Sequence, residues 1–294
     1  MLQILVNSAI YASEIAIIAV GVALAYSVVR FANFAHIQYA VIGGYLTYTV
    51  RGMGFDLPVA TAVSAVLTGL MAIAVERLVF HPLRAMRPEA KMIASWGVAL
   101  LLRSAVASVF GGAARVFDID TDSYLLGDAV VTSLDLTVIG TTVAAMIVLQ
   151  LLLHRTRLGT GLRALADNRD LAQTRGIPPD RLTALMWFVA GAFAALGGTL
   201  FALETRLQPD MDLQILLPVF AAVTIGGLSS LAGAVAGACV LSLVQNIAIG
   251  IDFGSLFTGT PWYLPSQFRD TIAVAAMVLV LCLKPRQRRS SLVR

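Results

Sequence analysis

The sequence predicts an all-α fold, a polytopic transmembrane helix bundle with about eight to nine membrane segments, one or two of them broken or re-entrant. Of its 294 residues, 58% are hydrophobic and 13% are charged, whereas a typical soluble domain has about 25% charged residues. Several apolar runs approach the roughly 20 residues that a helix needs to cross a bilayer. These runs are long and rich in Ala, Leu and Val, whereas a membrane β-barrel would show short alternating segments.

Charged or Gly/Pro-rich breaks divide the chain into successive apolar runs. They cover residues 4–29, 36–50, 57–80, 92–110, 136–154, 182–204, 214–229, 231–250 and 268–284. The 36–50 and 214–229 runs are short and end near Gly43-Gly44 and Gly226-Gly227, so either run is a candidate for a broken or re-entrant helix.

The distribution of charge predicts how the bundle is oriented. Lys and Arg concentrate in residues 81–91, in residues 155–181 and near the C-terminus, while acidic residues dominate 118–135 and 210–212. Because basic loops stay on the cytoplasmic side, we expect the N-terminus outside and the C-terminus inside. The sequence thus predicts one transmembrane domain, residues 1–284, that includes the cytoplasmic segment 155–181, followed by a basic cytoplasmic tail, residues 285–294.

The sequence shows no motif for ATP hydrolysis and no residue pattern typical of metal or nucleophilic catalysis. A phosphate-binding loop ends in Gly-Lys-Ser/Thr, but neither Lys91 nor Lys284 follows a glycine. His36, His81 and His154 are isolated in the sequence, which gives no metal-ligating or nucleophilic pattern. We therefore expect a non-enzyme without bound cofactor or metal. Topology explains the basic residues, so no nucleic-acid partner is expected.

The segment 159–181 is long for a simple connection between two membrane helices. Apolar residues recur in it at roughly helical spacing: Leu162, Leu165, Ala166 and Ala172. Gly176, followed by Ile177 and two prolines, supplies a stop signal. This pattern predicts a short amphipathic helix outside the membrane, which can insert into the groove of a partner. The alternative is a solvated basic loop that only fixes the topology.

Three stretches resemble one family. The residues Gly161, Arg163, Ala164, Ala172, Gly176 and Ile177 resemble the ATPase-coupling motif of ABC importer permeases, in the form used by the branched-chain amino acid permease family. Asn33-Phe34-Ala35-His36 and residues 221–237 fit the same family, and the order of apolar runs extends the match over nearly the whole chain. The chain departs from the family at Ile37, where glycine is usual, and at Lys284-Pro285-Arg286, which replaces a Pro-Arg-Gly-type ending.

The resemblance implies a multi-pass permease subunit of an ABC importer in the bacterial inner membrane, carrying a small polar solute such as a branched-chain amino acid. It also implies a second permease subunit, similar or identical to this chain, with a heterodimer as the expected form. Two ABC ATPase subunits that hydrolyse the ATP, an extracytoplasmic substrate-binding protein and membrane lipid are the other partners it implies. A similar permease for urea or short-chain amides remains open. So do a secondary transporter or channel, a membrane-embedded enzyme and a purely structural subunit.

Polar groups inside the apolar runs are candidates for the translocation pathway, because each costs about 2.5–3.5 kcal/mol to insert. Glu14 and Arg103 lie at similar expected depths, and we expect them either to pair with each other or to contact substrate. The remaining candidates are Asn33, Thr224, Gly226 and Gly227. Glycines in the 221–237 stretch could equally serve close helix packing.

Overall fold

The computed structural model describes residues 1–252 and 263–283. The predicted tail, 285–294, lies outside this part of the chain. Each predicted apolar run forms a helix: α1 (Leu2–Val29), α2 (Ala35–Gly52), α3 (Leu57–Val75) continued by the π-helix η1 (Glu76–Phe80), α4 (Pro88–Phe110), α5 (Ser133–Arg155), α8 (Pro179–Glu204), α9 (Met211–Gly226), α10 (Leu231–Gly250) and α12 (Arg269–Leu283), which follows the 3₁₀ turn η2 (Ser266–Phe268). Within the described residues, 7 helices are long and apolar enough to cross a membrane, and α9 is a shorter apolar helix.

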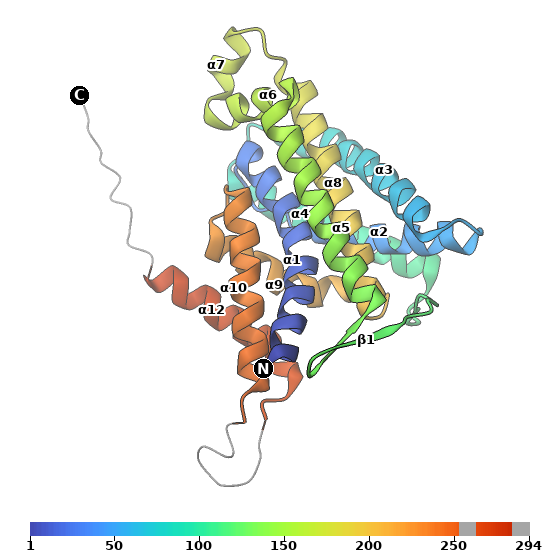
Figure 1. Cartoon of the computed structure of the whole chain (residues 1–294). Helices are drawn as coiled ribbons and strands as arrows, with labels where there is room; N and C mark the ends of the chain where they lie inside the picture. The colour runs from blue at the N-terminus through green and yellow to red at the C-terminus, as the bar shows by residue number, and fades with distance from the viewer. Residues whose placement is uncertain (253–262, 284–294) are drawn as a thin grey trace.

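The bundle is organised around α1 and α8 (Figure 1). Helix α8 packs against α1, α2 and α3, while α10 packs against α1 and α9. The rings of Phe80 and Trp187 stack at 5.6 Å between centroids, which fixes the end of η1 on α8. The peripheral helices α4, α5 and α12 instead expose large apolar side chains such as Leu101, Ile147 and Leu279, as expected of surfaces that face lipid or another membrane subunit.

Helix α2 runs without interruption through Gly43-Gly44, so the expected break at this pair is wrong. The two glycines serve packing instead. A Cβ at Gly43 would overlap the backbone of Ala195 on α8, and one at Gly44 would lie 2.9 Å from the side chain of Leu207. At the second pair α9 does end, with Gly227 at φ 102° beginning the turn into α10.

Two short helices lie at one end of the bundle, and a hairpin lies at the other, beside the N-terminus (Figure 1). The helices are α6 (Arg157–Asp167) and α7 (Arg169–Thr174). The hairpin was not predicted and pairs β1 (Ser123–Leu126) with β2 (Ala129–Thr132) in antiparallel register. Gly127, with φ 63°, begins its two-residue turn. A Gly-Asp pair between apolar residues is a recognised hairpin signal that could have located it.

Candidate functional site

The segment predicted as one amphipathic helix forms two, α6 and α7, because Asn168 interrupts it. Asn168 has an extended backbone, and its side chain accepts a hydrogen bond from the Leu171 backbone N–H at 3.0 Å. It thereby caps the N-terminus of α7, as asparagine commonly does. Thr156 caps α6 in the same way through the Gly159 N–H, at 3.3 Å.

Helix α6 is seated tightly on the ends of α5 and α8. Gly161 lies close to α8, because a Cβ there would be 2.6 Å from the end of the Leu182 side chain. The Arg163 guanidinium donates to the carbonyl oxygen of Leu153 on α5 at 2.8 Å. Half-buried Ala164 packs against the hydrophobic core. A displacement of α6 would therefore also displace the ends of α5 and α8.

The other three coupling candidates form the C-terminal cap of α7. The Ile177 N–H donates to the Ala172 carbonyl at 3.1 Å, and the Gly176 N–H donates to the Gln173 carbonyl at 3.0 Å. This pair of bonds is the Schellman motif, which needs a residue in the left-handed conformation just after the helix. Gly176 supplies it, with φ 79°. All six predicted coupling residues are thus brought into one compact element.

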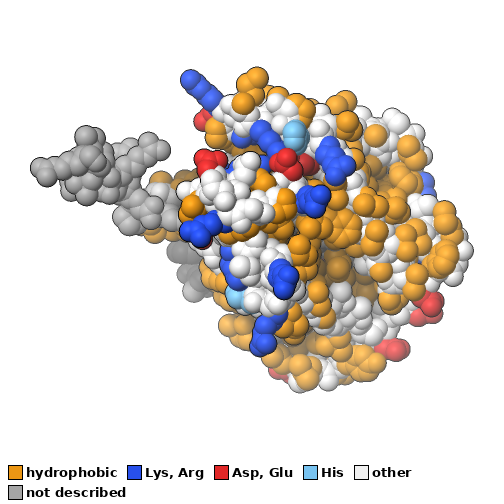
Figure 2. Space-filling model, turned by 90° about the horizontal axis from the view of Figure 1, so that it is seen from above, with side chains coloured by type: hydrophobic (Ala, Val, Ile, Leu, Met, Phe, Trp, Pro, Cys, Tyr) orange, Lys and Arg blue, Asp and Glu red, His pale blue; other side chains and the backbone are white. Residues whose placement is uncertain are grey.

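This end of the molecule is rich in Lys and Arg side chains, which gather over α6 and α7 (Figure 2). Leu171 on α7 is 56% exposed. A hollow of about 820 Å³ lies beside α6, with Thr160, Ile177 and Leu185 among its lining residues.

An ion network connects α7 to two membrane helices. Arg84, in the loop after η1, lies 3.1 Å from the buried Glu76 carboxylate and 2.5 Å from Asp180 at the start of α8. Arg169 on α7 also contacts Asp180, at 3.2 Å. The network gives α7 a charged link to η1 and α8.

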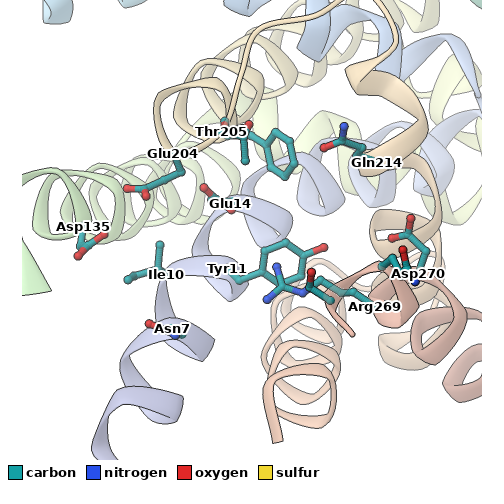
Figure 3. Close-up of a pocket in the computed structure, with 13 residues that line it drawn as sticks. Asn7, Ile10, Tyr11, Glu14, Asp135, Glu204, Thr205, Gln214, Arg269 and Asp270 are labelled. Carbon is teal, nitrogen blue, oxygen red and sulfur yellow. Dashed lines mark hydrogen bonds between the residues drawn. The ribbon is translucent and has the colours of Figure 1, made fainter. Parts of the chain in front are cut away.

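A polar cavity of about 560 Å³ opens near the end opposite to α6 and α7 (Figures 1 and 3). Its charged lining residues are Glu14 on α1, Asp135 on α5, Glu204 on α8, and Arg269 and Asp270 on α12. Glu14 is only 3% exposed, and its Oε1 has no hydrogen-bond partner among the described residues. Of the candidate pathway residues, Glu14 alone is among the residues that line this cavity.

The other candidate pathway residues lie elsewhere. Arg103 does not pair with Glu14; its Nε lies 3.7 Å from Asp212 on α9, so the expected pairing is wrong. Buried Asn33 accepts a hydrogen bond from the Ala35 N–H at 3.1 Å, which fixes the start of α2. Thr224 is half-buried on α9.

Gly226 and Gly227 have clear structural roles. A Cβ at Gly226 would overlap the Gly233 carbonyl on α10, and one at Gly237 would overlap the Ala222 carbonyl. The expectation that this stretch packs two helices closely is therefore met, with Gly227 forming the turn between them.

The sequence matches the family model described as "Branched-chain amino acid transport system / permease component" over residues 4–281. The chain belongs to this family. It is therefore a multi-pass membrane protein of the permease class, as its helices indicate.

Relatives of this permease extend over the full chain. The high-affinity branched-chain amino acid transport system permease protein BraD of Pseudomonas aeruginosa is 26% identical, covering 97% of this chain and 94% of BraD. The corresponding protein LivH of Escherichia coli is 24% identical, with the same coverage of each chain. A solved structure of PsaBC from Streptococcus pneumoniae in complex with Fab covers 96% of this chain and 92% of its own, with a TM-score of 0.50 and 14% identity. That likeness shows a shared fold alone.

Most of the charged residues that line the permease's cavity were missed by sequence reasoning. Asp135, Glu204 and Arg269 lie at the ends of their apolar runs, where charged residues usually meet water or headgroups. Nothing in the sequence shows that three such ends converge. Glu14 was found because a carboxylate in the middle of an apolar run is unusual.

Proposed function

We propose that this permease imports branched-chain amino acids, driven by separate ABC ATPase subunits that act on α6 and α7. The observation that carries the proposal is the compact element made by the six coupling residues, which is seated on α5 and α8 and exposes Leu171. A segment of this kind can transmit a push from a partner to the membrane helices, because packed elements shift as rigid units.

The assembly we propose has four kinds of component. This chain pairs with a second, similar permease subunit, and two ATPase subunits dock on the α6–α7 end. An extracytoplasmic binding protein delivers the solute at the end where the hairpin lies. The apolar surfaces of α4, α5 and α12 then face lipid or the second permease.

We infer that the α6–α7 end is cytoplasmic and that the protein lies in the bacterial inner membrane. The Arg-rich end in Figure 2 supports this orientation under the positive-inside rule. The orientation we propose has the N-terminus outside and the C-terminus inside.

Reconstitution tests the transport function. Proteoliposomes should contain this chain, a second permease and the ATPases, with the binding protein added. They should take up L-leucine only when ATP is present on the side of the membrane where the ATPases lie. Uptake driven by an ion gradient without the ATPases would contradict the proposal. ATP-dependent uptake of urea or acetamide in place of leucine would support an ABC importer but contradict branched-chain amino acids as its solute.

A surface substitution tests the docking of the ATPases. Leu171→Asp removes the exposed apolar side chain on α7, so the amount of ATPase that co-purifies with the permease should fall at least tenfold, which corresponds to about 1.4 kcal/mol. Leu125→Asp is the matched control, because Leu125 is also exposed but lies on β1 at the other end. Equal ATPase recovery with both variants would contradict docking on α7.

Thiol labelling tests the orientation. In a background without Cys239 and Cys282, which are both exposed and free, Leu171→Cys should react with a membrane-impermeant maleimide only after the cells are opened. Leu125→Cys should react in intact spheroplasts. The reverse pattern would overturn the orientation.

A further inference from the structure

The polar cavity contains a buried acid that lacks a donor. Glu14 is 3% exposed and its Oε1 has no partner among the described residues. Figure 3 shows that the Glu14 and Glu204 carboxyl groups lie close together between α1 and α8. Ionised carboxylates accept hydrogen bonds and cannot donate them. In its ionised form, a buried carboxylate is stabilised by a cationic donor, which a ligand can supply.

The cavity also contains a cation with unused donors. The Arg269 guanidinium lies over the Tyr11 ring, 4.5 Å from its centroid, and its Nη2 donates to Asn246 Oδ1 at 3.1 Å. Its Nε is buried and has no partner among the described residues. Because arginine has five N–H donors in a planar fork, these contacts position it and leave donors for an anionic group.

Glu14 and Arg269 line the same cavity without a direct ion pair between them. No ion pair within 4.0 Å joins them in the part of the chain that the structure describes. The two charges therefore face one cavity separately. Ile10 and Phe201 contribute apolar wall to the same cavity.

These features fit a small zwitterion with an aliphatic side chain. We propose that the cavity is a binding site for the transported amino acid, in which Glu14 and Glu204 receive its α-ammonium group and Arg269 receives its α-carboxylate. This inference rests on the proposed import function. The volume of about 560 Å³ falls within the usual range for small-molecule sites, about 300–1,000 Å³.

A metal ion fits the cavity less well than an ammonium group. Among the described residues, no group of three or more His, Cys, Asp or Glu side chains is arranged to hold a metal. The carboxylates come from separate helices, and one of the charged lining residues is an arginine.

The test measures direct binding of L-leucine to the purified permease–ATPase complex without the binding protein, so that the selectivity of that protein does not enter. Two leucine analogues separate the two charges: the 2-hydroxy acid lacks the ammonium group, and L-leucinamide lacks the carboxylate. The wild-type complex should prefer leucine to each analogue by roughly tenfold to a hundredfold, the range for a hydrogen bond to a charged group.

Substitutions then assign each charge to its side chain. Glu14→Gln should reduce the preference over the hydroxy acid and keep the preference over leucinamide, while Arg269→Met should do the opposite. Asp128→Asn and Arg206→Met are matched controls, because both residues are exposed and outside the cavity lining. They should keep both preferences. If a variant fails to assemble, Glu14→Asp or Arg269→Lys moves the charge without removing it, and the same preference should fall by a smaller factor.

Two results would overturn the site. One is the absence of saturable leucine binding to the wild-type complex. The other is that Glu14→Gln and Arg269→Met each change the preference over the hydroxy acid and the preference over leucinamide by the same factor. The failure of the proposed function is distinguishable, because it appears as no ATP-dependent leucine uptake by the wild-type assembly. Normal uptake kinetics in Glu14→Gln and Arg269→Met would refute the site while leaving the import function standing.

Discussion

The Arg30 guanidinium donates a hydrogen bond to the backbone carbonyl of Ala166, with 2.8 Å between Nη2 and the oxygen. Arg30 ends α1 in a left-handed conformation, with φ 56°. Ala166 is in the last turn of α6, where carbonyl groups lack helical partners and a positive charge is favourable. The bond connects the proposed coupling element directly to α1, the helix that also carries Glu14.

Replacing Arg30 by methionine should loosen the last turn of α6. A cation at a helix C-terminus contributes about 0.3–1 kcal/mol, so amide hydrogen exchange over residues 164–167 should become about two- to fivefold faster. Hydrogen-exchange mass spectrometry measures this rate. Arg51→Met is the control, because Arg51 donates a comparable exposed bond to the Asp118 carbonyl in a different loop. Unchanged exchange in α6 would show that the Arg30 bond does not hold this turn.

Gly176→Ala should destabilise the cap of α7. A left-handed backbone costs an L-residue about 1–2 kcal/mol more than glycine, and Gly176 has φ 79°. The local cost should appear as faster exchange of the Gly176 and Ile177 amides, with a smaller increase for Gly176→Asn, because asparagine tolerates this conformation. Gly112→Ala is the control, since its site is open and has no positive φ. Equal protection in Gly176→Ala and wild type would contradict the motif.

The helices were predictable because an apolar run of bilayer length has few alternatives in lipid. The expected run 231–250 matches α10, and the others agree to within a few residues at their ends. A short helical segment between α5 and α8 was also predictable from the length and apolar spacing of residues 159–181. Its division at Asn168 was not, because the dihedral angles of a single residue decide whether one helix or two form.

The partners of buried polar groups were not predictable from depth along a helix. Glu14 and Arg103 were expected at similar depths, but depth does not specify the direction in which a side chain points around the helix axis. Arg103 points toward Asp212 on α9, and Glu14 faces the cavity between α1 and α8. The cavity itself depends on the convergence of several helix ends, which only tertiary packing determines.

The close packing of α9 and α10 should make Gly237 sensitive to a single methyl group. A Cβ at Gly237 would overlap the Ala222 carbonyl, and overpacking of this kind costs about 1–3 kcal/mol. Gly237→Ala should therefore lower the apparent thermal midpoint of the purified protein in detergent. Gly140→Ala on α5 is the control, because nothing lies within 4 Å of its Cβ. It should be neutral or stabilising by up to about 1 kcal/mol. A Gly237→Ala variant as stable as Gly140→Ala would contradict the packing.

The ion pairs that Arg84 makes with Glu76 and Asp180 should contribute very different amounts to the stability of the protein. The Glu76 side chain is 5% exposed and the Asp180 side chain is 66% exposed. Arg84→Met leaves the Glu76 carboxylate buried without its cation, and we expect a cost of about 2–3 kcal/mol, below the 3–5 kcal/mol of a fully buried pair because Arg84 itself is partly exposed. Asp180→Asn should cost about 0–1 kcal/mol, as exposed pairs do.

The double variant Glu76→Gln with Arg84→Met isolates the cause of this difference. It removes the stranded charge together with its partner, so it should recover most of the stability that Arg84→Met loses, and thermal unfolding of the four proteins of the cycle measures the coupling. Additive losses in the cycle would mean that Arg84 acts through Asp180 and Arg169 alone. In that case this ion network would link α7 to the start of α8 but not to η1.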